Sequence, residues 1–222
     1  MRPWGPACGD TESSRVELDL LLDLATGPGT YIDVGANIGA IALPFAKQRP
    51  DWRVLAIEAH RGLSGVLWTN AMINRLYNVD VHHAAAGAAR GLAEFPALAL
   101  SSRTNFGAVG FKSTTGATET VRMLALDDVA PDDTRLVKID VEGFEPEVLK
   151  GADALLNSHR AAWIVEATIQ NPEAAIEVIN CFRQKGYSLH WLFAPFATPK
   201  SEKDRPTTPM MGDANIVALP RG

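Results

Sequence analysis

The sequence predicts an α/β fold built around a seven-stranded sheet. Short apolar runs alternate with longer amphipathic stretches along most of the 222 residues, which is the pattern of strands covered by helices. Helical crossovers of this kind make neighbouring strands parallel. A chain of this length buries one good core and is near the upper limit of what remains one unit, so we expect residues 1–222 to form a single domain.

Seven short segments rich in apolar and β-branched residues are the expected strands. They are residues 30–34 (TYIDV), 53–59 (RVLAIEA), 79–85 (VDVHHAA), 135–141 (RLVKIDV), 161–167 (AAWIVEA), 187–193 (YSLHWLF) and 215–220 (NIVALP). Five amphipathic stretches are the expected helices, and the last two open with a proline near the first turn. They cover residues 16–25, 38–48, 62–75, 145–156 and 172–185.

Two internal segments interrupt this alternation. Residues 87–129 contain β-like pieces but no convincing helix, so we expect an inserted hairpin or extra strands there. Residues 194–214 carry four prolines and mixed charges, which predicts a long loop. Residues 1–15 are expected to be an N-terminal extension of the domain.

The composition makes several classes of partner unlikely candidates. With 21 basic against 26 acidic side chains and no long run of either sign, neither nucleic acid nor an anionic membrane is expected as a partner. Cys8 and Cys181 lie far apart and form no CxxC pair, so neither a disulfide framework nor a zinc site is indicated. No signal peptide or spanning segment is evident, and we expect a cytoplasmic protein.

The segment DVGANIG, residues 33–39, joins the first expected strand to a helix through a glycine-bearing turn. Such a turn places backbone N–H groups and the positive helix end at the carboxyl edge of the strand, where ligands bind. A dinucleotide fingerprint would need a middle glycine, but Ala36 and Asn37 follow Gly35. Asp33 would repel a pyrophosphate and could accept hydrogen bonds from a cationic amino group.

The second expected strand ends with Glu58, which stands where such folds place a carboxylate on ribose hydroxyls. A cofactor with a free ribose diol and an amino-acid end suits both Glu58 and Asp33. The sequence therefore predicts S-adenosylmethionine (SAM). The alternative for Asp33 to Gly39 is a tight turn without a ligand, and for Glu58 an exposed strand end.

A second polar cluster lies in LVKIDVEGFEPEVLKGA, residues 136–152. Lys138, Asp140 and Glu142 alternate along the expected strand, so all three should project to one face before Gly143 ends the strand. Ionisable groups at the end of an apolar strand are costly unless they are solvated, paired or used. We predict a functional use, with an ion pair of Lys138 as the structural alternative.

These residues also resemble a known family. The segments IDVGANIG, IEAH, NAMINRLYNVDVHHAAAG, NFGAVGF, LDDV and, above all, VKIDVEGFEPEVLKGA are similar to the FkbM family of SAM-dependent methyltransferases. The resemblance covers about residues 28–193 and implies the class I methyltransferase sandwich, whose last strand is antiparallel. One departure is Ala59, where relatives usually have proline after the ribose-binding glutamate.

The resemblance implies roles for individual residues. The turn would hold the methionine part of SAM, Glu58 would bind the ribose, Ala85 and Ala86 would flank the adenine, and Asp140 would face the transfer centre. The predicted turn residues are Asp33, Gly35, Ala36, Asn37 and Gly39. Asn105 and Phe106 would line the acceptor pocket, with an ordinary strand of the insert as the alternative.

The reaction that the resemblance implies is methylation of a hydroxyl on a sugar, glycan or natural product. Candidates for accepting the hydroxyl proton are Asp140, Glu142, Lys138 if its pKa is lowered, or a histidine. Glu166 is a further carboxylate at this edge, or a solvated strand end. Consecutive His82 and His83 point to opposite faces, so no metal site is predicted there, and metal dependence stays open.

Two other classes of function remain alternatives. A nicotinamide-dependent oxidoreductase would share the sheet and the ribose carboxylate but would want the missing middle glycine. A noncatalytic protein of this fold would be expected to lose the acidic residues at the cofactor edge. The oligomeric state is left open, with a homodimer as one option.

Overall fold

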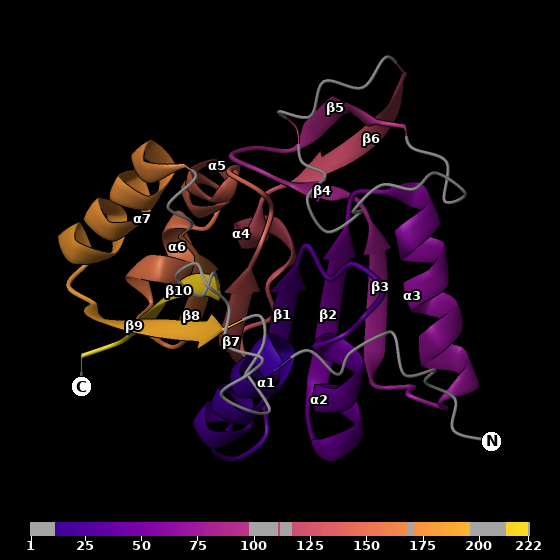
Figure 1. Ribbon diagram of the computed structural model, residues 1–222, viewed down its shortest axis with the longest axis horizontal. Coiled ribbons are helices and arrows are strands. Elements are labelled where there is room, and N and C mark those ends of the chain that lie inside the picture. The colour runs from indigo at the N-terminus through magenta and orange to yellow at the C-terminus, as the bar shows by residue number, and fades with distance from the viewer. Residues whose placement is uncertain (1–11, 98–110, 112–116, 168–170, 196–211, 222) are drawn as a thin grey trace, which may run out of the picture.

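The computed structural model describes residues 12–97, 111, 117–167, 171–195 and 212–221. Its main feature is a seven-stranded sheet in which β10 runs antiparallel to both neighbours while the other described pairs are parallel (Figure 1). The strands are, in spatial order, β3 (Val79–His83), β2 (Arg53–Glu58), β1 (Thr30–Val34), β7 (Thr134–Ile139), β8 (Ala162–Glu166), β10 (Gly212–Leu219) and β9 (Ser188–Pro195). The predicted α/β fold is confirmed.

Helices cover both faces of this sheet, because side chains alternate across each strand. On β1, Tyr31 packs on one face while Ile32 and Val34 pack on the other. The face of Tyr31 is covered by α1 (Glu12–Leu24), α2 (Ala42–Gln48) and α3 (Arg61–Ile73). The opposite face is covered by α4 (Leu126–Val129), α5 (Glu145–Lys150), α6 (Asp153–Asn157) and α7 (Pro172–Gln184).

A second, three-stranded sheet has the order β4-β6-β5 and lies beyond the carboxyl ends of β1 and β2 (Figure 1). Its strands are β4 (Ala85–Ala86), β5 (Gly91–Pro96) and β6 (Thr118–Leu124). The extra strands predicted within residues 87–129 are therefore confirmed. Ala85, Phe95 and Val121 form a small apolar cluster of their own in this sheet.

Several predicted boundaries were wrong. The helix expected over 145–156 is two helices, because Gly151 passes so close to another loop that a Cβ there would lie 2.0 Å from the carbonyl oxygen of Gly87. The segment 87–129 does contain a helix, the short α4. The strand expected over 79–85 breaks at Ala84, after which β4 leaves the main sheet for the small one.

Other boundaries shift by a few residues. Helix α2 starts at Ala42 instead of residue 38, because the turn after β1 continues that far. Both ends of the loop expected over 194–214 belong to β9 and β10, and its middle lies outside the described residues. No helix within the described ranges is long and apolar enough to cross a membrane.

Strand β1 is the point at which the chain reverses its direction across the sheet. The chain proceeds from β1 through β2 to β3 on one side, and β7 then pairs with β1 on the other side. In open α/β sheets, ligands bind in the crevice beyond the carboxyl ends of the strands at such a point. The loops after Val34 and Ile139 are therefore the expected walls of a site.

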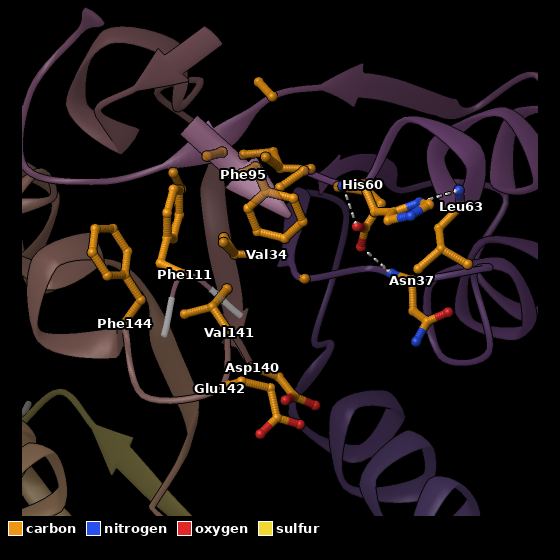
Figure 2. Close-up of a pocket in the computed structure, with 17 residues that line it drawn as sticks. Val34, Asn37, His60, Leu63, Phe95, Phe111, Asp140, Val141, Glu142 and Phe144 are labelled. Atoms are coloured by element: carbon orange, nitrogen blue, oxygen red, sulfur yellow. Dashed lines mark hydrogen bonds between the residues drawn. The ribbon is translucent and has the colours of Figure 1, made fainter. Parts of the chain in front are cut away.

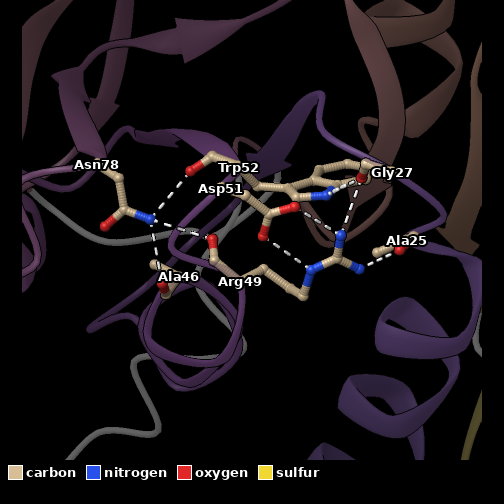
Figure 3. Close-up of polar contacts among 7 residues, drawn as sticks. All are labelled: Ala25, Gly27, Ala46, Arg49, Asp51, Trp52 and Asn78. Carbon is tan, nitrogen blue, oxygen red and sulfur yellow. Dashed lines mark hydrogen bonds and ion pairs between the residues drawn. The ribbon is translucent and has the colours of Figure 1, made fainter.

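The opposite, amino edge of the sheet is held by a network around Arg49 (Figure 3). The guanidinium donates hydrogen bonds to the carbonyl oxygens of Ala25 and Gly27, pairs with Asp51 at 2.9 Å and lies 5.3 Å from the ring centroid of Trp52. The amide of Asn78 donates to three carbonyl oxygens, those of Ala46, Arg49 and Trp52. The network joins the segments that precede β1, β2 and β3.

Replacing Arg49 tests whether this network stabilises the fold. We expect Arg49→Ala to lower the free energy of unfolding by about 2 kcal/mol, because several charge-assisted hydrogen bonds are lost together. The matched control is Arg53→Ala, which removes an exposed ion pair with Asp80 and should cost under about 1 kcal/mol. Urea unfolding measures both, and equal losses for the two variants would contradict the structural role of Arg49.

Candidate active site

An open cavity of about 580 Å³ lies at the carboxyl edge of the sheet, between the loops after β1, β2 and β7 and the small sheet (Figure 2). Its walls differ in character, because carboxylates and backbone groups lie on one side and aromatic rings on the other. The predicted site residues that line it are Gly35, Asn37, Glu58, Ala85, Ala86, Asp140 and Glu142. Asp33, Ala36, Lys138, Gly39 and Glu166 are outside its lining.

At Gly35 the loop after β1 passes very close to the backbone of the loop after β7. Its φ is +80°, and a Cβ at this position would lie 1.9 Å from the carbonyl oxygen of Asp140. Its N–H donates to the carbonyl oxygen of Ile57 at 2.9 Å, so the turn is fixed to β2 as well as to β7. The glycine is therefore required by the protein's own backbone as well as by the strained turn that the sequence predicted.

Asn37 and Gly39 complete the turn in left-handed backbone conformations, with φ of +52° and +89°. Asparagine tolerates this region better than most residues with a side chain. A Cβ at Gly39 would lie 2.5 Å from a side-chain carbon of Leu67, so this glycine allows α2 and α3 to pack closely. Gly39 therefore serves the packing behind the turn.

Glu58 is fixed by two backbone donors. The N–H of His60 donates to Oε1 at 2.7 Å, and the N–H of Asn37 donates to Oε2 at 2.8 Å (Figure 2). Burial raises the pKa of Glu58, while these two N–H groups act in the opposite direction. Since each carboxylate oxygen has two acceptor sites, both oxygens of Glu58 can still accept a hydroxyl donor.

His60 is a functional neighbour for which the sequence analysis assigned no role. Its Nδ1 accepts hydrogen bonds from the N–H groups of Gly62 and Leu63 at 3.1 and 3.2 Å, so the ring caps α3. This cap fixes the segment that follows Glu58, which includes Ala59. The available signal was a histidine two residues before the expected start of a helix.

Three aromatic rings form the apolar wall of the cavity (Figure 2). The ring centroids of Phe95 and Phe111 are 5.2 Å apart, and those of Phe111 and Phe144 are 4.5 Å apart. This wall was not predicted from the sequence, because its rings come from three separate parts of the chain. They lie in β5, between β5 and β6, and directly before α5. The predicted acceptor residues Asn105 and Phe106 lie outside the described residues.

Lys138 is the centre of a buried charge cluster beneath the cavity. Its ammonium donates to Asp140 Oδ2 at 2.7 Å and lies 4.0 Å from Glu17 Oε2 of α1. Asp33 is its neighbour in the register between β1 and β7, and Asn215 of β10 donates to Glu17 at 2.7 Å. The structural alternative for Lys138, an ion pair that includes a helix residue, is therefore present.

The electrostatics of this cluster decide the role of Lys138. Burial by itself lowers the pKa of Lys138, but Asp140, Glu17 and Asp33 raise it well above its ordinary value. An ammonium that keeps its proton cannot accept another, so Lys138 is unsuited to be the general base. It lies at the centre of the buried carboxylates instead.

The loop that follows β7 departs from the predicted strand. The strand ends at Ile139, so the alternation expected for Lys138, Asp140 and Glu142 stops before Glu142. Glu142 has a φ of +53° and Gly143 a φ of +89°, so two successive residues are left-handed. This turn brings the carboxylates of Asp140 and Glu142 together at one side of the cavity (Figure 2).

Glu166, at the end of β8, lies beside these two carboxylates. Oxygen atoms of Asp140, Glu142 and Glu166 lie within 4.8 Å of one another, a grouping that could hold a cation. Burial raises the pKa of Glu166 to about 10, with Asp140 and Glu142 adding to the rise. This rise favours the protonated form of Glu166, which argues against Glu166 as the general base.

Asp33 lies behind the turn, and only 2% of it is exposed. Its Oδ1 accepts no hydrogen bond from the described residues. Burial raises its pKa to about 6, Lys138 acts in the opposite direction, and Asp140 adds to the rise. Asp33, the carboxylate predicted to hold the methionine part, therefore lies buried beneath the cavity, where it interacts electrostatically with Lys138.

The raised pKa of Asp33 predicts a dependence of stability on pH. Between the ordinary pKa of 3.8 and about 6, the folded protein holds a proton that the unfolded chain has lost. The free energy of unfolding should therefore fall as the pH rises through this window, by roughly 3 kcal/mol for this group. Asp33→Asn should remove that part of the fall in urea unfolding between pH 4 and 7.

The control for this prediction is Asp19→Asn, at an exposed position of α1. Its curve of stability against pH should run parallel to that of the wild type. A curve for Asp33→Asn that is also parallel to the wild type would contradict the buried, proton-binding carboxylate.

Comparison with known proteins adds to this geometry. The sequence model of the methyltransferase FkbM domain matches residues 33–189, well over half of the chain. No curated protein matches the chain at a significant level. Methyltransferase FkbM from Methylobacillus flagellatus KT has a similar structure, with a TM-score of 0.64 and 18% identity over 95% of this chain and 49% of that one.

Two further solved structures share the fold. Precorrin-6y C5,15-methyltransferase from Geobacter metallireducens GS-15 has a TM-score of 0.56 at 15% identity, covering 94% of this chain and 87% of that one. Precorrin 8w decarboxylase from Methanobacterium thermoautotrophicum has a TM-score of 0.55 at 18% identity, covering 91% and 88%. At these identities the likeness shows the fold alone.

The chain spans about half the length of the Methylobacillus protein. The match of the domain model includes the glycine turn, Glu58, and the loop that carries Asp140 and Glu142. The chain belongs to the FkbM family of SAM-dependent methyltransferases.

Proposed function

We propose that this enzyme methylates a hydroxyl group of a small molecule or glycan. The observation that carries the proposal is the pair of carboxylates, Asp140 and Glu142, which line the same cavity as the aromatic wall. A carboxylate that reaches the acceptor can take the hydroxyl proton, and the rings can pack against the acceptor's apolar surface.

The residues of the cavity fit the cofactor. Glu58 presents acceptor sites for the two ribose hydroxyls, and Ala85 leaves room beside Phe95 for a flat base. The turn from Gly35 to Asn37 would hold the amino-acid end. When bound, SAM supplies the methyl group as an electrophile on its sulfonium centre.

The buried charges favour a cationic ligand. Three carboxylates, those of Glu17, Asp33 and Asp140, surround the one ammonium of Lys138, and Glu142 lies nearby on the cavity side. Unbalanced negative charge at a partly buried site is costly unless a cation compensates it. The cluster therefore supports tighter binding of sulfonium-bearing SAM than of its neutral product, S-adenosylhomocysteine (SAH).

The proton of the acceptor hydroxyl would pass to Asp140 or Glu142. The raised pKa values of Lys138 and Glu166 favour the protonated form of each, which argues against both as bases. Lys138 holds Asp140 in place through the 2.7 Å ion pair. The oxygen of the acceptor would form a new bond to the methyl carbon while the bond from that carbon to the sulfonium sulfur breaks. The hydroxyl proton would move to the carboxylate, and SAH would be the leaving group.

The lining of the cavity and the charge of the chain support a small acceptor. The cavity combines a few polar groups with a wall of aromatic rings, which is typical of small-molecule sites. The net charge of −5 does not favour binding to the polyanionic backbone of nucleic acid.

Incubation with methyl-labelled SAM tests the proposed acceptor class. Panels of hydroxylated small molecules and glycans should gain label in a bond that resists alkali, as an ether does, and SAH should accumulate in equal amount. Amines of the same size serve as the control. Label that enters only amines, protein or nucleic acid would overturn the hydroxyl acceptor.

A further inference from the structure

Glu145 is the one acidic residue of the KIDVEGFE segment that the proposed function does not assign to the transfer centre. Only 3% of it is exposed, although it lies next to a cavity that contains water-accessible carboxylates. Its Oε1 accepts hydrogen bonds from two backbone N–H groups, that of Val141 at 3.2 Å and that of Gly143 at 3.0 Å. A single oxygen therefore closes the loop on both sides of Glu142.

The loop that Glu145 closes is the strained part of the site. Glu142, at its centre, has a φ of +53°, a region that is unfavourable for a residue with a side chain. Such a conformation persists where the surrounding structure determines it. The start of the loop is tied to β1, because the N–H of Asp140 donates to the carbonyl oxygen of Val34 at 3.0 Å. Glu145 fixes the remainder of the loop through its hydrogen bonds with Val141 and Gly143.

We propose that Glu145 is a positioning residue for methyl transfer. By accepting the amide hydrogens of Val141 and Gly143, its carboxylate holds the left-handed turn that presents Asp140 and Glu142 to the cavity. This proposal rests on the proposed function, since it assigns those two carboxylates to the transfer centre. Glu145 itself does not line the cavity.

Three substitutions separate the hydrogen bonds from the charge. Glu145→Gln keeps an oxygen that can accept both N–H groups and removes the charge. Glu145→Asp keeps the charge and withdraws the oxygen by one methylene. Glu145→Ala removes both. The matched control is Glu147→Ala in the same turn of α5, whose part-exposed carboxylate pairs with Lys150.

Amide hydrogen exchange in the full chain reports the turn directly. We expect exchange of the Gly143 N–H to be at least tenfold faster in the Ala and Asp variants than in the wild type. The Gln and Glu147→Ala variants should stay within about threefold of the wild type. Because the Asp variant is the milder change, it keeps the test usable where Glu145→Ala fails to fold.

Calorimetric titration with SAH and with SAM then reports the consequence. SAH affinity, which depends on Glu58 and the first turn, should stay within about threefold in all variants. The preference for SAM over SAH should fall at least fivefold in the Ala and Asp variants and be largely kept in the Gln variant, where the turn that carries Asp140 and Glu142 remains in place.

The outcomes separate the two proposals. A wild type that binds no SAH would remove the proposed function, while the exchange result would still decide whether Glu145 holds the turn. Unchanged exchange at Gly143 in the Ala and Asp variants would overturn the positioning role. An unchanged preference for SAM in those variants, or an equal loss of SAM and SAH affinity, would overturn it as well.

Discussion

Glu58→Ala should weaken SAH binding by at least about 100-fold, a loss of about 2.7 kcal/mol. The substitution removes both acceptors for the ribose hydroxyls, and hydrogen bonds to a charged group contribute about 1.5–3 kcal/mol each. It also frees the N–H groups of Asn37 and His60, which Glu58 holds at 2.8 and 2.7 Å, so the two turns that border the ribose position loosen together. Calorimetric titration with SAH measures the loss.

The control for this prediction is Glu177→Ala, which changes an exposed carboxylate on α7, away from the cavity lining. It should bind SAH as the wild type does. Thermal unfolding of both variants separates loss of binding from loss of folding. A folded Glu58→Ala protein with SAH affinity within tenfold of the wild type would contradict the assignment of Glu58 to the ribose.

Gly35→Ala should destabilise the fold by about 3 kcal/mol or more. The new Cβ would lie 1.9 Å from the carbonyl oxygen of Asp140, and backbone cannot give way as a flexible side chain can. Overpacking of this kind costs about 1–3 kcal/mol, and the φ of +80° adds about 1–2 kcal/mol for a residue with a Cβ. Urea unfolding of the ligand-free protein measures the change.

The same chain offers a glycine with the opposite expectation. Gly65 lies on the exposed side of α3, and a Cβ there meets nothing within 4 Å. Gly65→Ala should therefore raise stability by about 0.5–1 kcal/mol, because alanine is the better helix former. Equal effects of the two substitutions would show that the crossing of the β1 and β7 loops is not as tight as the structure has it.

The sequence predicted the fold and half of the site because their signals are local. Each strand of the main sheet is a short apolar run, and the glycine turn after β1 consists of consecutive residues. Glu58 could be identified by its place at the end of the next strand. Each of these features is determined by residues that are close together in the sequence. The structure places Gly35, Asn37 and Glu58 in the lining of one cavity.

The remaining features of the site depend on distant parts of the chain. The partner of Lys138 in α1, Glu17, comes from a helix in which nothing marks it as special. The aromatic wall joins rings of Phe95, Phe111 and Phe144 from three segments. The alternation of polar residues in KIDVE continued past the true end of β7, so it concealed the left-handed turn at Glu142.

The most direct test of the central claim is a calorimetric titration of the wild-type protein with SAH, with NAD titrated in parallel. The cavity between the glycine turn, Glu58 and Asp140 predicts saturable binding of SAH at one site per chain and no binding of NAD. Binding of NAD, or binding of SAH that persists unchanged in Glu58→Ala, would contradict the claim that this cavity is the SAM site.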